Sequence, residues 1–470
     1  MKSHQHQSGL LRREFLQVGF AAGAGIALSE VFDGRAQANP SRDSDGAVRP
    51  APRARAKSCI IVWMTGGPAQ MGTWDPKPDA KEIVRGEYRA ISTNVPGVQF
   101  CNLLPKTALH ADKLAIIRTI TLGAEDDNHN IGTNLLMTGL DKVPPGTNGV
   151  YQSRNDWPCY GSALAYARPN RDGLPTAVAL PTHLTDSGGI FPGQRAGLLG
   201  ARYDPFRVDR DPNAPDFRVE DVTPPPGLTA ERLHSRRALL GEIEQQRRAL
   251  DRHVSLREYG SIQQKAFNVV TSSRTAAAFD LAKEPDRVRD RYGRHAFGQT
   301  LLLARRLVET GVGVVQANMG SMNTWDTHQD EHKSMTTRLM PPFDQGYAAL
   351  IEDLHQRGLL AETLVVCMAE MGRNPHLGAP TAGGTPGVTS GRNHWGYVWS
   401  IALAGGGVQG GRVLGKTDDE GGYPDGEAWR PSDIAATIYS CLGVDPRAEM
   451  IDQLGRPFVL NRGNVIAGLL

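Results

Sequence analysis

The sequence has few cysteines, almost no net charge and no long apolar run beyond its N-terminal region. Its five cysteines are an odd number, and Cys59 and Cys367 lie within apolar segments, which favours small buried side chains over a disulfide framework. The formal net charge is +2, with 52 basic and 50 acidic residues intermixed, so no basic surface for nucleic acid is expected. After residue 38 no apolar stretch reaches the length of a transmembrane helix. These absences exclude a disulfide-rich scaffold, a nucleic-acid partner and a transmembrane anchor.

The N-terminal region has the pattern of an export signal. Arg12 and Arg13 are followed by a mild apolar stretch rich in alanine and glycine, and the Ala-Gln-Ala sequence ending at residue 38 is typical of a cleavage site. The paired arginines favour the twin-arginine route, which delivers proteins to the periplasm or outside the cell. An ordinary basic N-terminus is the alternative. Residues 39–57 are polar and rich in proline, so we predict a disordered leader there.

Apolar segments of strand length alternate with helical patterns along the rest of the chain. Buried strands are predicted, in chain order, at residues 58–64, 113–120, 176–180, 311–319, 363–370 and 397–405. Amphipathic helices are predicted at residues 295–309, at 343–355 and, with an N-cap at Ser432 and a closing Gly443, at 432–443. This alternation predicts an α/β fold, with a mostly parallel sheet covered by helices on both faces.

A proline-rich segment, residues 223–227, interrupts the alternation. The charged stretch after it carries an apolar stripe at helical spacing, formed by Leu233, Leu240, Ile243 and Leu250. We interpret residues 228–292 as a helical insertion in one domain that spans residues 58–470. A solvated helical hairpin without a functional role is the alternative for this segment.

Acidic and imidazole side chains lie next to several of the predicted strands. Asp326 and His328 follow the fourth strand in the sequence WDTH, Glu370 ends the fifth strand, and His394 directly precedes the sixth. His129 follows the second strand in the first turn of a helix. In a parallel sheet we expect these positions to gather at one edge, where ligands of such folds bind. Together they form a ligand set for Zn²⁺ or a similar divalent ion, although each alone is also explained as a turn former, a cap or a hydrogen-bonded polar residue.

Two arginines accompany these residues. Arg373 follows Glu370 in the sequence EMGR, and Arg392 precedes His394 in the sequence GRNHW. Their fixed positive charge would suit an anionic ester. Four other histidines are interpreted as surface residues: His183, His332, His355 and His376.

Several segments in this order resemble the DUF1501 proteins, which are exported proteins grouped with the alkaline phosphatase and sulfatase superfamily. They are GGPAQMGTWDPKP at 66–78, NHNIGTNLLMTG, LLGARYDPF, WDTH, EMGRNP, GRNHW and LAGGGVQGGRVLG. The resemblance covers nearly the whole mature chain and implies an alkaline phosphatase-like, three-layer α/β/α sandwich. It also implies a divalent metal ion (Zn, Ca, Mg or Mn) at the carboxyl edge of the sheet and a nucleophile at a helix N-terminus, where backbone N–H groups favour an anionic ester.

The superfamily pattern leaves three roles open for His129. Sulfatases carry C-x-[PA]-x-R before a Thr-Gly that closes the nucleophile helix; Thr138-Gly139 matches the second part, and counting back places His129 at the nucleophile position. No cysteine begins the first motif, so formylglycine chemistry is not expected. His129 is therefore a metal ligand, a histidine nucleophile or only a helix cap, and His is a recognised covalent catalyst as well as a common ligand.

The sequence also departs from the superfamily pattern. Thr65 stands where the first strand usually ends in an Asp, Gly72 replaces an Asp common in the family, and an Asp-His pair becomes Glu370-Met371. Asp75 in TWDPKP remains as a candidate base or nucleophile. These departures argue against a two-metal clamp and leave two alternatives, one metal held by Asp326, His328, Glu370 and His394, or no metal.

Two functions fit these observations. In the first, the protein is an exported, metal-dependent hydrolase of phosphate or sulfate esters, which acts on an anionic ester or a sulfated or phosphorylated glycan. Arg373 or Arg392 would then hold the anion, and Asp75 or His129 would act as base or nucleophile. In the second, it is a catalytically inactive envelope protein that binds anionic glycans. We favour the first, because several ligand-type residues at strand ends would be costly to bury without partners.

Overall fold

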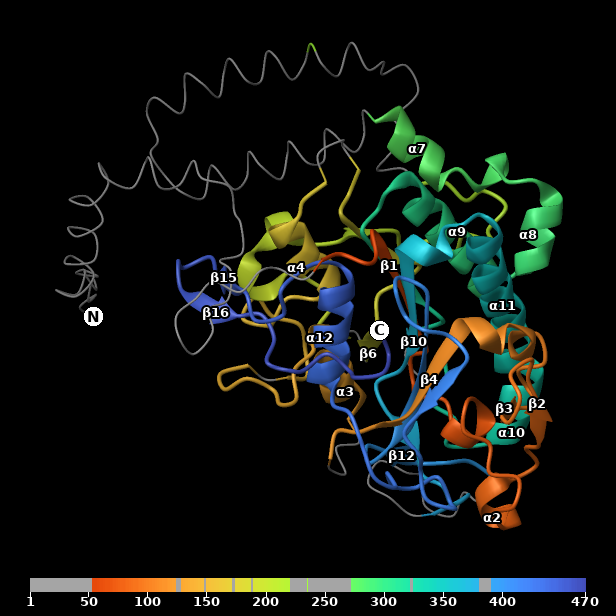
Figure 1. The fold of residues 1–470 in the computed structure, drawn as a ribbon. Coiled ribbons are helices and arrows are strands. Elements are labelled where there is room, and N and C mark those ends of the chain that lie inside the picture. Colours follow the sequence, from red (N-terminus) through yellow and green to blue (C-terminus); the bar gives the residue numbers. More distant parts are fainter. Residues whose placement is uncertain are drawn as a thin grey trace, which may run out of the picture. The chain divides into compact units, whose positions relative to one another are not determined.

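The computed structural model describes residues 53–123, 128–147, 149–170, 174–186, 189–219, 235, 272–321, 324–379 and 390–470 (Figure 1). The predicted export signal and most of the predicted helical insertion lie outside these residues. In the described ranges, no helix combines the length and the apolar character that a membrane span requires. The described chain starts slightly before the predicted strand at 58–64: Ala56 is buried, and the N–H groups of Arg55 and Ala56 donate to the carbonyl of Cys441.

The largest sheet of the described chain has eight strands and contains all six predicted ones. In spatial order they are β14 (Arg412–Leu414), β4 (Leu114–Ile120), β13 (Trp399–Ala404), β10 (Thr363–Met368), β1 (Ser58–Trp63), β9 (Val314–Asn318), β5 (Ala177–Leu180) and β8 (Phe206–Arg207). Residues of β1, β9, β10 and β13 are buried throughout, because both faces of the sheet are covered. The predicted α/β fold class is confirmed.

One strand of this sheet runs against the others. β1 is parallel to β10 and β9, and the pairs β9–β5, β5–β8 and β14–β4 are parallel as well. β13 is antiparallel to both of its neighbours, β10 and β4. The residues that precede β13 therefore lie at the carboxyl edge of the parallel strands. A parallel sixth strand would have placed His394 at the opposite edge, so our reason for grouping it with Asp326 was wrong, although its position next to this strand was correct.

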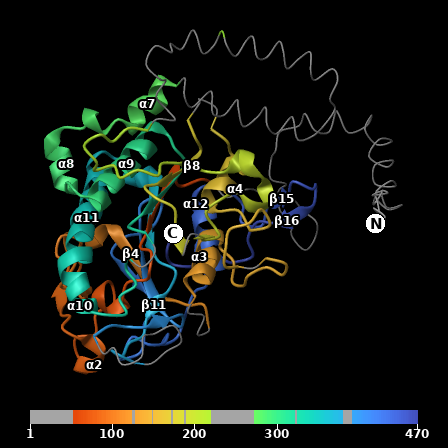
Figure 2. The same ribbon diagram turned by 180° about the vertical axis from the view of Figure 1, so that it is seen from behind.

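Two layers of helices cover the sheet and complete the three-layer arrangement (Figures 1 and 2). Ile60 and Val62 of β1 pack in the core that includes α9 (Ala296–Thr310) and α11 (Met340–Gln356). Cys59, Ile61 and Trp63 point to the other face, into the core that includes α3 (His129–Thr138), α4 (Tyr160–Ala167) and α12 (Pro431–Cys441). All five cysteines are free and buried, as predicted.

The predicted helices agree with α9, α11 and α12 except at one end. α12 begins at Pro431, with Arg430 as its N-cap, so the predicted cap at Ser432 was wrong. Ser432 lies in the first turn, where its N–H and hydroxyl both donate to the carboxylate of Asp141. Proline suits the first helical position because its missing N–H has no helical partner there. Gly443 follows the helix with φ +71°, as the closing glycine should.

Short elements complete the described chain. The two-stranded sheets are β2 (Ala90–Ser92) with β3 (Gln99–Cys101), β6 (Thr185–Asp186) with β7 (Gly189–Ile190), β11 (Gly372–Arg373) with β12 (His394–Trp395), and β15 (Glu449–Ile451) with β16 (Pro457–Val459). The remaining α-helices are α2 (Glu82–Arg85), α7 (Ser273–Phe279), α8 (Asp286–Tyr292) and α10 (Glu331–Ser334), and a π-helical turn, Met335–Leu339, precedes α11. The β11–β12 ribbon pairs Arg373 with His394 and so joins EMGR to GRNHW.

Candidate functional site

The N-terminus of α3 lies against the turn that follows β10. Asn128 is the N-cap, and its side-chain oxygen accepts from the N–H groups of Asn130 and Ile131. His129 is therefore the first residue of the helix and not its cap, which removes one of the three predicted readings. Gly132 permits the close approach, since a Cβ there would lie 2.8 Å from the carbonyl oxygen of Glu370. The helix thus delivers the His129 side chain to the carboxyl edge of the sheet.

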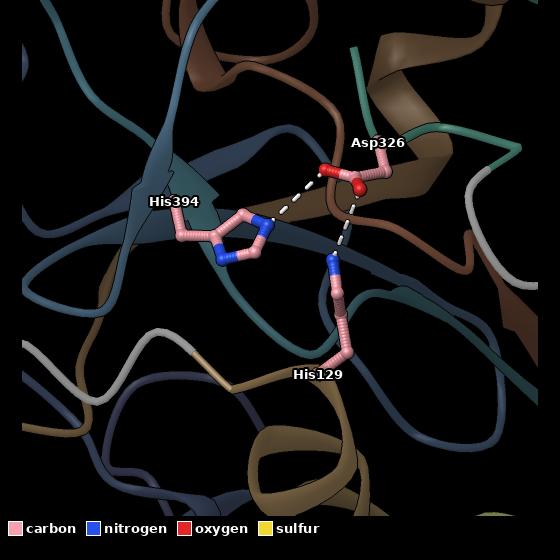
Figure 3. Close-up of side chains that lie close together, drawn as sticks. All are labelled: His129, Asp326 and His394. Carbon is pink, nitrogen blue, oxygen red and sulfur yellow. Dashed lines mark hydrogen bonds and ion pairs between the residues drawn. The ribbon is translucent and has the colours of Figure 1, made fainter. Parts of the chain in front are cut away.

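Three side chains from distant segments converge at this edge (Figure 3). Nε2 of His129 lies 3.4 Å from Oδ2 of Asp326, and Nε2 of His394 lies 3.2 Å from Oδ1 of the same carboxylate. One donor atom from each residue fits within 4.8 Å of the others. The loops after β1 and β9 pack backbone to backbone here: Gly66 has φ +111°, and a Cβ on it would lie 2.5 Å from the Asp326 nitrogen.

His328 adds a third imidazole, held in one tautomer by its neighbour Asn393. The Asn393 amide nitrogen donates to the carbonyl of Ala379, so its oxygen faces Nδ1 of His328 at 2.7 Å. That oxygen can only accept, and Nδ1 must carry the proton. In the neutral ring Nε2 then presents a lone pair, 3.0 Å from Asp326 Oδ1 and 3.0 Å from His394 Nε2. A lone pair facing a carboxylate at this distance requires a proton or a cation between them.

Glu370 orients His129 in the same way. Its Oε1 accepts from Nδ1 of His129 at 2.8 Å and from the N–H of Gly66 at 2.7 Å. Nε2 of His129 consequently points at Asp326 and has no hydrogen-bond partner in the described part of the chain. A carboxylate behind a histidine is the usual outer support of a metal-binding imidazole. We had predicted Glu370 as a ligand. The structure instead places it behind the donor atoms, in contact with Nδ1 of His129.

Arg373 is enclosed and fixes Asp326. Its side chain has no exposed surface, and Nη2 lies 2.5 Å from Asp326 Oδ1. The guanidinium also donates to the carbonyls of Gly66, Gly67 and Arg392. All three nitrogens are occupied, so this arginine ties the loop after β1 to Asp326 and is not available to an anion from solvent.

The charges of the cluster shift the pKa values of its members. Burial alone would raise the pKa of Asp326, but Arg373 and the three imidazoles outweigh burial and hold it well below its usual range. Burial would lower the pKa of His129, whereas the carboxylates of Asp326 and Glu370 raise it to about 9. The pKa of His394 is lowered, mainly by burial, with Arg373 and His129 adding to the effect against Asp326. Without an ion, His129 therefore carries a proton at neutral pH and His394 does not.

Two predicted site residues lie outside this cluster. Arg392 is fully buried, and its guanidinium donates to Glu331 at 3.0 Å and to the carbonyls of Val84, Asn374 and Pro375. It holds loops together, so the predicted contact with an anion was misplaced. Asp75 pairs with Lys77 at 3.4 Å and Arg118 at 3.3 Å and accepts from the hydroxyl of Thr417. Among the described residues, Asp75 thus contacts these three side chains and not the cluster around Asp326.

The donor atoms fit a divalent cation. Tetrahedral Zn²⁺ with bonds of about 2.0–2.1 Å has its ligand atoms about 3.3 Å apart. The neighbouring donor pairs in the cluster are separated by 3.0 to 3.4 Å. Two of the imidazoles have Nδ1 engaged by an outer acceptor, so their Nε2 atoms face the common point. His129, His394 and Asp326 therefore form a suitable donor set, and His328 lies beside Asp326 and His394 as a candidate fourth ligand. No pattern in the sequence indicates Asn393, which acts on a histidine 65 positions away.

The family model described as "Protein of unknown function (DUF1501)" matches residues 56–470. The chain belongs to the DUF1501 family. This confirms the resemblance found in the motifs. No curated protein matches the sequence of this DUF1501 protein.

Solved structures of similar fold include a sulfatase, a lipoteichoic acid synthase and an alkaline phosphatase. A sulfatase from Pseudoalteromonas sp. is 13% identical, with 84% of this chain and 68% of that chain covered and a TM-score of 0.34. The lipoteichoic acid synthase LtaP from Listeria monocytogenes is 11% identical, with 87% and 77% covered and a TM-score of 0.36. An alkaline phosphatase from the Antarctic bacterium TAB5 is 9% identical, with 84% and 99% covered and a TM-score of 0.34. At these TM-scores the likeness carries no argument about activity, which must come from the site itself.

Proposed function

We propose that this DUF1501 protein is a metal-dependent hydrolase of phosphate or sulfate esters. The observation that supports the proposal is the convergence of His129, His394 and Asp326, whose donor atoms all lie within 4.8 Å of one another, with Nε2 of His328 3.0 Å from both Asp326 and His394. His129, His328, His394 and Asp326 would hold the ion. A donor set rich in imidazole favours Zn²⁺ over Ca²⁺ or Mg²⁺, which prefer oxygen ligands. The predicted export signal would place the reaction in the periplasm or outside the cell.

The chain's own residues prepare the site in a defined way. A divalent ion bound here supplies a Lewis acid for the ester oxygen and lowers the pKa of water. Glu370 keeps Nδ1 of His129 protonated and its Nε2 directed inward, and Arg373 holds Asp326. α3 has no Ser, Thr or Cys at its first position, so we expect direct attack by water and no covalent ester intermediate. The side chains of His129, His394 and Asp326 are about one-tenth exposed, which limits competing water.

Elemental analysis and ester hydrolysis test this proposal together. We expect about one divalent ion per chain and turnover of 4-nitrophenyl phosphate or 4-nitrophenyl sulfate that chelation abolishes. His394→Ala should lower metal affinity and turnover strongly, since it removes a ligand. His376→Ala is the matched control, because His376 is exposed and pairs only with Glu420 among the described residues. Protein without metal and without turnover on either ester would refute the proposal.

Glu370→Gln separates a supporting residue from a ligand. Glutamine keeps an acceptor for Nδ1 of His129 but loses the charge, so metal affinity should fall by about 10–100-fold, as is usual for outer-shell changes. Stoichiometric metal should still bind at saturating concentration. If binding of a sulfated glycan survives both chelation and His394→Ala while no ester is hydrolysed, the alternative of an inactive, glycan-binding envelope protein is correct.

A further inference from the structure

A second polar cluster lies at the carboxyl edge of the sheet, at the end formed by β5 and β8. β5 is followed by His183, β8 ends at Arg207, and Asp209 comes two residues later. β5 and β8 are parallel neighbours, with Ala179 beside Arg207, so the residues after each strand leave the sheet on the same side. No motif connects these three residues, and we had interpreted His183 as a surface residue.

Asp209 bridges the two basic side chains. Its Oδ1 lies 3.2 Å from Nη2 of Arg207, and its Oδ2 lies 3.2 Å from Nε2 of His183. Asp209 is about half exposed (48%), whereas the side chains of Arg207 and His183 are only 16% and 22% exposed. The cluster therefore opens to solvent on the carboxylate side.

Several buried polar atoms of this cluster lack partners. Nε and Nη1 of Arg207 and Nδ1 of His183 are shielded from solvent and make no hydrogen bond within the described ranges. A buried guanidinium donor without an acceptor costs free energy that water or an anion must offset. Of the guanidinium nitrogens of Arg207, Asp209 accepts only from Nη2, so the other two are available to a ligand.

A further arginine makes the cluster electropositive. Burial is the main cause of the lowered pKa of Arg207. The charge of Arg195 adds to this effect, and Asp209 opposes it. Burial, Arg207 and Arg195 likewise lower the pKa of His183, again against Asp209. Two positive charges, those of Arg207 and Arg195, therefore act on this cluster against one half-exposed carboxylate. The neutral His183 ring donates from Nε2 to Asp209, which leaves Nδ1 as an acceptor.

We propose that Arg207 binds a sulfate or phosphate group, and that Nδ1 of His183 accepts a hydrogen bond from a hydroxyl next to it. An anionic group with a neighbouring hydroxyl is the chemistry of a sulfated or phosphorylated sugar. Guanidinium donors suit such oxyanions because their hydrogen bonds are assisted by charge.

The position of this second anion site defines a substrate class, an extension that rests on the function proposed above. β8 lies two strands from β9 and three from β1, the strands whose loops carry Asp326 and Gly66. With about 4.8 Å between strands, the two sites are on the order of 10–15 Å apart along the edge. A ligand that fills both sites is a chain bearing several anionic groups, such as a multiply sulfated or phosphorylated oligosaccharide.

Titration of the chelated, full-length protein with sodium sulfate and with sodium phosphate, at ionic strength balanced by chloride, tests the site directly. Calorimetry should show saturable binding of at least one of the two anions. Arg207→Gln should weaken this binding at least tenfold. Arg412→Gln is the charge-matched control, since Arg412 is exposed on β14 at the other end of the sheet, and it should leave binding unchanged.

Asp209→Asn supplies a test in the opposite direction. It removes the competing negative charge from a half-exposed position, so binding of the same anion should tighten several-fold without loss of the fold. This variant also decides the matter if Arg207→Gln does not fold. Absence of saturable binding, an equal effect of Arg207→Gln and Arg412→Gln, or no gain in Asp209→Asn would overturn the inference.

The two proposals fail in different experiments. Asp326→Asn should abolish ion binding and leave sulfate or phosphate binding to the chelated protein intact. If esters are hydrolysed, Arg207→Gln should raise KM for a multiply charged oligosaccharide and leave kcat/KM for 4-nitrophenyl esters unchanged. A loss on both substrates alike would contradict a role in recognising the chain.

Discussion

Ion binding at the Asp326 cluster should tighten as the pH rises from 7 to 9, because His129 must lose a proton to become a ligand. Its pKa is raised to about 9 by the carboxylates of Asp326 and Glu370, against the effect of burial. At pH 7 the protonated form of His129 then exceeds the neutral form by about 100-fold, because this pH lies about two units below the pKa. Each unit of pH below 9 therefore weakens binding about tenfold, or about 1.4 kcal/mol.

The sign follows from competition between the ion and the proton. An ion binds the neutral imidazole, so a raised pKa opposes binding at low pH and ceases to do so above about 9. His394, whose pKa is lowered, is already neutral at pH 7 and releases no proton. We expect His129 to release about one proton per ion at pH 7.

Competition with a chelator of known pH dependence, from pH 7 to 9, measures the slope. Calorimetry in two buffers with different heats of protonation counts the protons released. His129→Gln should remove most of the slope and the proton release, while His376→Gln should change neither. An affinity that stays constant between pH 7 and 9, or a slope that persists in His129→Gln, would refute the role of His129 as a ligand.

Three further changes should have distinct effects. In chelated protein, the folded pKa of His129 of about 9 exceeds its unfolded value of about 6.5, so its stabilising effect is complete below pH 6.5 and is lost as the pH rises to 9. The free energy of unfolding in urea should thus favour wild type over His129→Gln at pH 6, and this advantage should be about 3 kcal/mol smaller at pH 9. A difference that does not change with pH would contradict the raised pKa. Arg373→Gln should lower the free energy of unfolding by about 3–5 kcal/mol, because it leaves the buried Asp326 carboxylate without its main counter-charge; a change below 1 kcal/mol in urea unfolding would show that the pair is not needed. Gly132→Ala places a Cβ 2.8 Å from the Glu370 carbonyl oxygen, so α3 must shift and metal affinity should fall at least tenfold, whereas unchanged affinity would show that the position of α3 is not critical.

The sheet was predictable because its strands are continuous apolar runs between polar turns. The prediction at 363–370, for example, corresponds to β10 at Thr363–Met368, and its burial on both faces explains the absence of polar positions. The direction of β13 was not predictable in this way. An apolar run reads the same for a parallel and an antiparallel strand, and only pairing with β4 and β10 decides between them.

The individual roles at the site were harder to predict than its location. Glu370, Arg373 and Arg392 all follow or precede predicted strands, as Asp326 and His394 do. Whether such a side chain faces the common point or a neighbouring backbone depends on its direction, which the sequence does not encode locally. Arg392 turns to Glu331 and to loop carbonyls, and Arg373 turns to Gly66 and Gly67 as well as to Asp326.

The parts of the candidate metal centre are widely separated along the chain, since 241 positions divide His129 from Glu370 and 304 divide Gly66 from Glu370. A nascent chain consequently holds no complete set of donors until its last third has been synthesised and has joined the first strand. Arg373 and the protonated His129 meanwhile balance the two carboxylates, so folding can finish without the ion. Loading would then follow folding, in contrast to small zinc domains that stay unfolded without metal. Stripped protein should therefore regain its ion on simple addition of the salt, with no denaturation step.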